Sequence, residues 1–396
     1  MTDGAASEET RAMGQSILTV DLGALAENWR RLSTRARGAE CAAVVKANAY
    51  GLGIGPVAQA LFDVGCRTFF VAHLGEGEIL RRVLRDSAPE PRIFILNGLA
   101  PASARFYVES QLIPILGSLP EIAEWAEFCA SDGVAHPAGL HIDTGMNRLG
   151  LAARDLKLAR ALSNSFTPVL AMSHFISAED ISAPTNRLQI ERFEQACAQL
   201  PPMPASLCNS SGLFLEDAPF LDLCRPGYAL YGGNPTPGSD NPMRRVVGLS
   251  SLVLQVRDVA AGETAGYNAR WTAPSRRRLA TINLGYADGF PRSGSEGLIA
   301  AEVFAAGHYC PIVGRISMDL SIIDVSETGP LRRGDRVEIL GPNISIDGLA
   351  AESGTIGYEI LTRLGARFRR EYIYGAEPPP ETPTDAPASE EANPSA

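Results

Sequence analysis

Short apolar runs recur between about Cys41 and Gly233, and stretches with helical periodicity lie between most of them. Residues 120–130 and 187–199 are examples of such amphipathic stretches. Strands that alternate with helices are typical of a parallel sheet covered by helices, and eight such units favour a (β/α)8 barrel of the TIM type. A short apolar run can also belong to a buried helix, so the pattern alone leaves that alternative open. The eight runs are Ala42–Val45, Thr68–Val71, Ile93–Leu96, Leu112–Ile115, Ala138–Ile142, Val169–Met172, Ala205–Cys208 and Leu221–Cys224.

The pattern changes after a Gly-, Pro-, Asn- and Ser-rich linker at Asn234–Pro242. Short strands between turns then predict a mostly-β C-terminal domain, and the isolated strand at 16–20 could cross over to join it. We therefore expect an α/β barrel at 16–245 and a β-domain at 246–376. A flexible N-terminus at 1–15 and a disordered, Pro- and Glu-rich tail at 377–396 complete the expected division. The expected strands are Ser251–Val256, Arg278–Ile282, Leu298–Phe304, Ile312–Val313, Leu320–Val325 and Arg336–Leu340.

Composition narrows the possible partners. The net charge of −10 argues against nucleic acid or an anionic membrane as a partner. No run of about 18 apolar residues is present, and the polar N-terminus does not resemble a signal peptide. The seven cysteines are scattered without a CxxC pair, which favours a reduced, cytoplasmic protein.

The chain contains only two lysines, Lys46 and Lys157, among 35 basic residues. Lys46 follows Val44-Val45, so we expect it at the C-terminal end of the first barrel strand, the face on which active sites of this fold gather. A desolvated lysine there could form a Schiff base, which arginine cannot do. The alternative is a solvated lysine at a strand end. Lys157 lies in a helical stretch and is expected on the surface.

Two loops after the last two expected strands have the small residues of a phosphate site. Asn209-Ser210-Ser211-Gly212 and Arg225-Pro226-Gly227-Tyr228 would bring backbone N–H groups and the Ser210 hydroxyl close to a bound phosphate. Each loop could instead be a simple turn.

Other polar residues gather at expected strand ends without a metal signature. His174 ends the sixth strand, and His141, Asp143 and Arg148 follow the fifth. None of their spacings matches a zinc motif, so no metal is expected. In the β-region Tyr267, Tyr286 and Tyr358 lie beside glycines, and each one taken singly is a packing residue.

Taken in order, these residues resemble the motifs of the alanine racemase family. Val45-Lys46-Ala-Asn-Ala-Tyr50-Gly is similar to the family's cofactor-lysine motif. The resemblance runs from about Leu18 to Tyr374. The further matching motifs are Asp143-Thr-Gly-Met-Asn-Arg148-Leu-Gly, Ser173-His174-Phe175, Asn209-Ser210, Arg225-Pro-Gly-Tyr-Ala-Leu-Tyr-Gly232, Gly285-Tyr-Ala-Asp-Gly289, Gly314-Arg-Ile-Ser-Met318-Asp319 and Gly354-Thr-Ile-Gly-Tyr358-Glu.

The resemblance implies an isomerase that uses pyridoxal phosphate (PLP) and supplies D-alanine for peptidoglycan of the cell wall. Lys46 would hold the cofactor and act as the base on D-alanine, and Tyr267 would act on L-alanine from the opposite face. A homodimer with shared active sites is implied, in which Tyr267, Tyr286 and Met318 come from the partner. Arg148 and Met318 would contact the substrate. The implied cofactor contacts are Lys46, Tyr50, Arg148, His174, Asn209, Ser210, Arg225, Gly227, Tyr228 and Tyr358, with Tyr286, Asp319, His141 and Asn147 in support.

Three positions depart from the common pattern of the family. His141 stands where many relatives have a carbamylated lysine that orients the arginine equivalent to Arg148. Asn147 replaces a common glycine and could hold Arg148 instead, and Ser317 replaces a frequent cysteine. These departures leave the breadth of substrate specificity open.

Three alternatives remain beside an alanine racemase. A racemase of broader specificity, or one for serine, would use the same scaffold. A PLP-dependent decarboxylase shares the barrel-plus-β architecture, but Tyr267 with Met318 favours racemisation. A non-catalytic PLP-binding barrel protein would lack the β-domain with its tyrosines.

Overall fold

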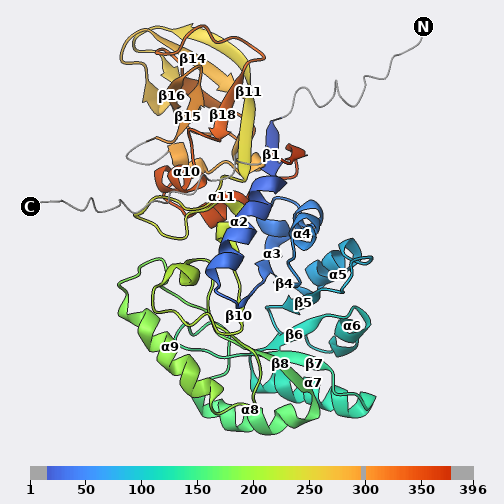
Figure 1. Ribbon diagram of the computed structural model, residues 1–396. Helices are drawn as coiled ribbons and strands as arrows, with labels where there is room; N and C mark the ends of the chain where they lie inside the picture. Colours follow the sequence, from blue (N-terminus) through green and yellow to red (C-terminus); the bar gives the residue numbers. More distant parts are fainter. Residues whose placement is uncertain (1–15, 296–299, 376–396) are drawn as a thin grey trace, which may run out of the picture.

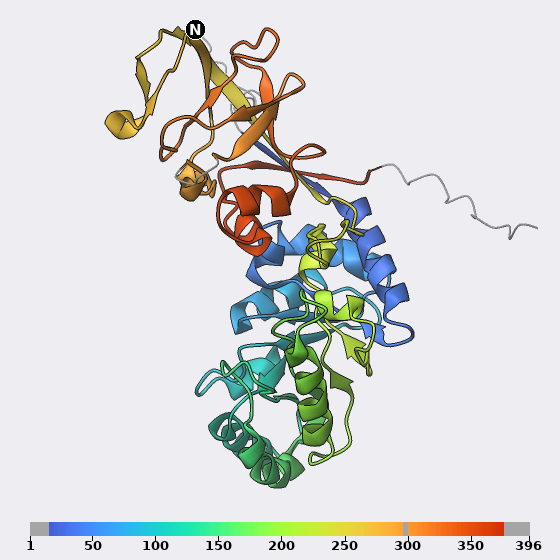
Figure 2. The same ribbon diagram turned by 90° about the vertical axis from the view of Figure 1, so that its left-hand side faces the viewer.

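The computed structural model describes residues 16–295 and 300–375. The expectations of a flexible segment at 1–15 and a disordered tail at 377–396 concern residues outside this range. The molecule is elongated, with a helix-covered barrel at the bottom of Figures 1 and 2 and a strand-rich region at the top.

Seven parallel strands form one curved sheet in the order β3-β4-β5-β6-β7-β8-β9. The eighth, β10 (Leu223–Cys224), pairs in parallel with β2 (Glu40–Cys41), which runs into β3 after one residue. Backbone bonds from Asp222 N to Ala205 O and from Arg225 N to Cys208 O join β10 to β9, so the ring closes. The predicted barrel is confirmed. Its other strands are β3 (Ala43–Val44), β4 (Thr68–Val71), β5 (Arg92–Ile95), β6 (Ile113–Leu116), β7 (Pro137–His141), β8 (Thr167–Met172) and β9 (Ala205–Ser206).

Helices follow the first six barrel strands, and those expected at 120–130 and 187–199 are α7 and α9. The expectation of helices between most of the strands is confirmed, and the last two strands are followed by 3-10 turns at Ser211–Phe214 and Tyr228–Tyr231. There α2 (Leu22–Arg35), which precedes β2, supplies the cover: Arg35 donates to Leu213 O at 2.6 Å and lies over the Phe214 ring. The other helices are α3 (Lys46–Tyr50), α4 (Ile54–Asp63), α5 (Leu74–Val83), α6 (Ala104–Glu109), α7 (Leu119–Asp132), α8 (Leu156–Leu162) and α9 (Pro184–Cys197).

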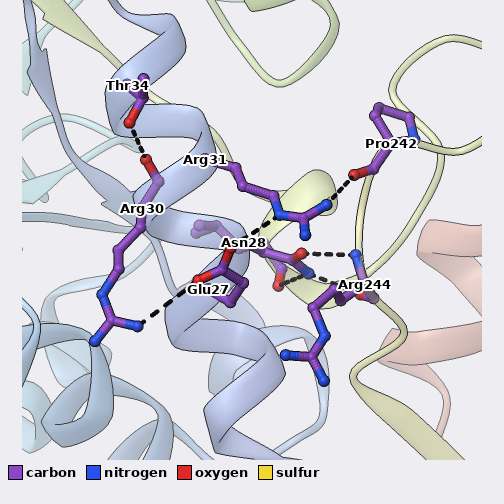
Figure 3. A network of polar contacts seen from close by, with 8 residues as sticks. Glu27, Asn28, Arg30, Arg31, Thr34, Pro242 and Arg244 are labelled. Atoms are coloured by element: carbon purple, nitrogen blue, oxygen red, sulfur yellow. Dashed lines mark hydrogen bonds and ion pairs between the residues drawn. The ribbon is translucent and has the colours of Figure 1, made fainter. Parts of the chain in front are cut away.

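A buried asparagine ties α2 to the segment that leaves the barrel (Figure 3). Asn28 Nδ2 donates to Leu230 O and Arg244 O, and Arg244 N donates to Asn28 Oδ1 at 2.7 Å. Because the side chain is fully buried and both its ends are bonded, its desolvation is compensated. Arg31 adds a bond to Pro242 O, so the linker is held on one helix face.

The upper region is built on one eight-stranded sheet with the path β16-β15-β18-β11-β1-β19; off this path β14 pairs with β11, and β17 pairs with β14. β1 (Ile17–Asp21) pairs antiparallel with β11 and parallel with β19, so the first described strand lies in the sheet of the C-terminal region. The division at residues 245 and 246 stays a prediction. The remaining strands are β11 (Val247–Val259), β14 (Arg277–Ile282), β15 (Glu302–Ala305), β16 (His308–Pro311), β17 (Ser321–Asp324), β18 (Arg336–Leu340), β19 (Arg369–Ile373) and the small pair β12 (Thr264–Ala265) and β13 (Trp271–Thr272).

The sequence was less informative about the β-region than about the barrel. The strand expected at Ile312–Val313 is wrong: Ile312 makes only an isolated bridge to Ile323, and β16 ends at Pro311. The strand expected at 298–304 begins at Glu302, and residues 298 and 299 lie outside the described range. Two helices were not expected, α10 (Ile346–Glu352) and α11 (Gly357–Thr362), although Ser345 caps α10. Both are short, and a short periodic segment carries little signal. Within the described residues, no helix is long and apolar enough to span a membrane.

Candidate active site

One cavity of about 670 Å³ opens at the C-terminal ends of the barrel strands. Its volume lies in the range of small-molecule sites, roughly 300–1,000 Å³. Eleven of the residues singled out from the sequence line it. They are Lys46, Tyr50, His141, Arg148, His174, Asn209, Ser210, Arg225, Gly227, Tyr228 and Tyr358. Tyr358 comes from α11, so the C-terminal region completes the wall.

Lys46 begins an unusual turn. Ala47, Asn48, Ala49 and Tyr50 all have φ near +54°, and Gly51 follows at +84°, so the chain makes one left-handed turn. Only Gly and, less so, Asn adopt this conformation readily, and each other residue costs roughly 1–2 kcal/mol. Such strain persists only where the surroundings enforce it, and it gathers at functional sites. The backbone around Lys46 is therefore held in place by other contacts.

Burial and nearby charges shift the pKa values of the ionisable groups at the site. Burial lowers the pKa of Lys46, and the nearby Arg148 lowers it further, while Glu76 acts in the opposite direction. Burial, followed by the positive Arg225, also lowers the pKa of His141 to about 4 and that of His174 to about 3. Both imidazoles are neutral at neutral pH. A half-buried lysine that loses its proton easily can act as a nucleophile or a base.

Arg225 is buried at the floor of the cavity and is fixed by oxygen acceptors. It donates to Ser206 Oγ, Ser173 O and Leu207 O. Burial lowers its pKa to about 10, so the guanidinium stays charged at neutral pH. It can offer N–H groups to a ligand but accept no proton from one.

Backbone N–H groups converge at one end of the cavity. Gly227 N and Ala229 N both donate to Ser210 Oγ, at 3.0 and 3.2 Å. A Cβ at Gly227 would lie 2.5 Å from Tyr50 Oη, so only glycine allows this close approach. Two amides that already meet an oxygen atom form an arrangement that suits an anionic oxygen of a phosphate. Asn209 supports the loop by accepting from Gly212 N.

Tyrosine rings wall the same end. The rings of Tyr228 and Tyr358 stack with centroids 4.1 Å apart, and Tyr50 lies 6.2 Å from Tyr358. Burial raises the pKa of Tyr50 and of Tyr358, so both hydroxyls stay protonated and can donate. The Tyr228 hydroxyl donates instead to Asp347 Oδ1 at 2.6 Å. A ligand would therefore be bound by the backbone of Tyr228 and not by its hydroxyl.

The loop after β7 carries Arg148 to the cavity. Asp143 Oδ1 accepts the backbone N–H groups of Gly145, Met146 and Asn147, which curls the loop. Asn147 is exposed with φ of +55° and is not among the residues that line the cavity. Its proposed contact with Arg148 is absent from the hydrogen bonds found between described residues, so Asn147 acts on the loop through its backbone.

Four predicted site residues form a separate cluster in the upper region. Tyr286 N and Ala287 N donate to Ser317 O and Met318 O, which holds Tyr286 beside Met318. Asp319 pairs with Arg367 at 2.7 Å. A Cβ at Gly266 would lie 3.0 Å from Arg315 N, so the turn of Tyr267 packs on the same loop. Tyr267, Tyr286 and Met318 are 65%, 38% and 54% exposed, and none of the four residues lines the cavity of Lys46.

Sequence reasoning missed several residues that shape the site. Glu76 accepts backbone N–H groups from the Lys46 turn, and Asp347 holds Tyr228. Gln189 on α9 donates to His174 O. The N-cap pattern at the start of α5 marks Glu76 as a helix-start residue, but its bond to Ala47 crosses to another strand and leaves no local signal. No group of three or more His, Cys, Asp or Glu residues in the described part of the chain is arranged to hold a metal ion.

Comparisons with known proteins agree on one family. The model for the alanine racemase N-terminal domain matches residues 20–235, and the model for its C-terminal domain matches 246–372. A curated alanine racemase of Methylobacterium nodulans is 55% identical over 91% of this chain and 96% of its own. Two paralogues of Agrobacterium fabrum, named biosynthetic and catabolic alanine racemase, are 42% and 43% identical over 94% and 90% of this chain, and over 97% and 92% of their own lengths.

A solved structure extends the agreement to three dimensions. It is the alanine racemase of Bartonella henselae, described as having covalently bound pyridoxal phosphate. It is 39% identical, covers 91% of this chain and 99% of its own, and superimposes with a TM-score of 0.86.

Proposed function

This chain belongs to the alanine racemase family, and we propose that it interconverts L- and D-alanine by moving the α-proton between two bases, Lys46 and Tyr267. The observation that carries the proposal is the cavity itself. It brings one amine with a lowered pKa, one fixed guanidinium and one anion-binding end together in about 670 Å³.

The residues of the cavity fit pyridoxal phosphate. The backbone of Gly227 and Tyr228, with the hydroxyls of Ser210, Tyr50 and Tyr358, would hold the phosphate. Lys46 Nζ would hold the other end of the cofactor, and the Arg225 guanidinium would face its ring nitrogen. His174 and Asn209 would complete the wall. The covalent cofactor of the Bartonella henselae enzyme supports this assignment.

When bound, PLP supplies a conjugated ring that delocalises the charge left on the α-carbon after a proton is removed. Lys46 Nζ would remove or return that proton on one face, a role that the lowered pKa of its amine favours. The Arg225 guanidinium does not readily give up a proton, so it would donate a hydrogen bond to the ring nitrogen without protonating it. Arg148 holds the substrate carboxylate at the mouth of the cavity. His141, buried and neutral on β7, stands where many relatives carry the carbamylated lysine.

Racemisation needs a second base on the opposite face, and the cavity of one chain does not contain it. We propose that Tyr267 of a second copy supplies this base, with Met318 and Tyr286 beside it and Asp319 fixing the loop. The exposure of these side chains, together with their absence from the cavity of their own chain, supports a homodimer with shared sites. A C2 arrangement would then complete two sites at once.

The physiological proposal follows from the product. D-alanine would serve peptidoglycan synthesis, and the relative named biosynthetic supports that use, whereas the one named catabolic favours alanine degradation. The seven cysteines lie in the described residues and are all free, which supports a cytoplasmic location.

A chiral assay of the purified protein with L-alanine, L-serine and L-lysine tests the substrate. We expect alanine to racemise fastest. If serine or lysine were faster, the assignment would pass to a broad-specificity racemase, and release of CO₂ without racemisation would favour a decarboxylase. Growth of a deletion strain only with added D-alanine would support the biosynthetic role.

A further inference from the structure

A single carboxylate joins the Lys46 turn to the neighbouring barrel loop. Glu76 Oε1 accepts the N–H groups of Ala47 and Asn48, at 2.6 and 3.4 Å. Its Oε2 accepts those of Ala72 and His73, at 2.9 and 3.3 Å. The four donors come from the ends of β3 and β4. Both oxygens are occupied, so one side chain fixes two loops relative to each other.

We propose that Glu76 is a positioning residue for Lys46: by binding both loops it holds the left-handed turn that aims the amine into the cavity. The inference rests on the proposed function. Because every residue from Ala47 to Gly51 is left-handed, the turn would unwind unless its backbone donors were satisfied in place. An ionised carboxylate satisfies such donors best, since charge-assisted hydrogen bonds are the stronger kind.

The other anchors of the turn bind its carbonyls and its later amides. Ala49 N donates to Val45 O, and Gly51 N and Gly53 N donate to Ala47 O and Asn48 O. Asn48 Oδ1 accepts Ile54 N at 2.9 Å, and Ala49 and Tyr50 are buried, but Ala47 and Asn48 are exposed. Glu76 binds the backbone N–H groups of these first two residues after the lysine. Glu76 also lies in the first turn of α5, where a negative charge is favoured by the helix dipole, so the carboxylate is itself held.

The barrel contains a second clamp of the same design, which serves as a control. Glu121, in the first turn of α7, accepts Leu99 N through Oε1 and Gly117 N through Oε2, both at 3.0 Å. It joins the loops after β5 and β6 and touches neither the Lys46 turn nor the cavity lining. Removing it should loosen the barrel to a comparable extent without moving the lysine.

The test compares the holoenzyme with Glu76→Ala, Glu76→Gln and Glu121→Ala. In Glu76→Ala we expect kcat to fall about 10- to 100-fold while KM for alanine stays within about twofold, because the amine is misplaced and the carboxylate contacts are kept. Backbone hydrogen exchange at Ala47 and Asn48 should become faster. Glu76→Gln retains one acceptor oxygen and should recover part of both losses. Glu121→Ala should speed exchange at Leu99 and Gly117 and leave kcat within about twofold of wild type.

Two results would overturn the inference. Unchanged exchange at Ala47 and Asn48 in Glu76→Ala would show that the carboxylate does not hold the turn. An equal fall of kcat in Glu76→Ala and Glu121→Ala would show that the effect is loss of barrel stability. Failure of the proposed function is separable, because wild type would then lack racemase activity whatever the exchange rates are. Visible absorbance of the cofactor in each variant distinguishes a misplaced lysine from a lost cofactor.

Discussion

The two groups of predicted site residues differ in how they are held. The barrel group is largely buried apart from the exposed Arg148, lines one cavity, and includes side chains fixed by hydrogen bonds, such as Arg225 and Ser210. The upper group, Tyr267, Tyr286, Met318 and Asp319, is exposed and is held mainly through its backbone, with one ion pair from Asp319 to Arg367. The barrel group forms a cavity for a small molecule within one chain. The side chains of the upper group are instead accessible to a second chain.

The largest expected effect is at the centre of the barrel group. Lys46→Ala should abolish the visible absorbance of the bound cofactor and lower activity by more than about 10⁴-fold, because both the attachment and one base are lost. Lys157→Ala, on exposed α8, is the matched control and should retain both. An absorbance spectrum and a chiral assay are sufficient. Unchanged absorbance in Lys46→Ala would defeat the cofactor assignment.

The upper group can be tested through complementation. Tyr267→Phe should lose about 10²- to 10⁴-fold in activity, with α-deuterium exchange from L-alanine impaired more than that from D-alanine. When equal amounts of Lys46→Ala and Tyr267→Phe dimers exchange subunits, half the dimers are mixed and each has one intact site. About a quarter of the wild-type rate should return. No recovery, despite confirmed subunit exchange, would place Tyr267 in its own chain's site.

A pH effect on stability should come from the barrel group. The pKa of His141 is lowered to about 4 and that of His174 to about 3, compared with about 6.5 in an unfolded chain. The unfolded chain therefore binds protons that the folded chain does not, and the free energy of unfolding should fall as pH drops below about 6.5. Each histidine contributes up to about 1.4 kcal/mol per pH unit. Urea unfolding at several pH values measures the slope, and His141→Asn should reduce it. An identical slope in the variant would contradict this assignment.

The smallest effects distinguish backbone from side-chain support in the upper group. A Cβ at Gly285 would lie 2.3 Å from Met318 O, so Gly285→Ala should cost about 1–3 kcal/mol. Asp319→Asn breaks an ion pair whose members are half exposed, and it should cost less than about 1 kcal/mol. Urea unfolding of both variants compares them. The reverse order would mean that the ion pair, and not the backbone contact, holds Met318 beside Tyr286.

The sequence predicted what is local or repeated. The runs at Thr68–Val71 and Arg336–Leu340 coincide with β4 and β18, because an apolar run between turns is a strong strand signal. The resemblance to known motifs named the cavity residues, although the roles of Lys46 and Tyr267 stay predictions. The roles of Glu76 and Asp347 were not predicted, because the site residues that they bind lie elsewhere in the sequence. Asp347, for example, accepts a hydrogen bond from Tyr228, 119 residues away. The left-handed turn was not predicted either, because alanines such as Ala47 and Ala49 have no preference for positive φ.

Tyr358 lines the cavity and Asp347 supports it through Tyr228, and this has a consequence for how the protein is synthesised. Lys46 leaves the ribosome early, but Tyr358 and the support of Asp347 arrive only near the end of synthesis. β1 is likewise synthesised long before β11 and β19, the two strands with which it pairs. A nascent chain can thus assemble most of the barrel while its phosphate end still lacks a wall. For the cofactor proposed above, tight binding would then require that the chain has been translated to Tyr358 and folded, so shorter products would not retain it.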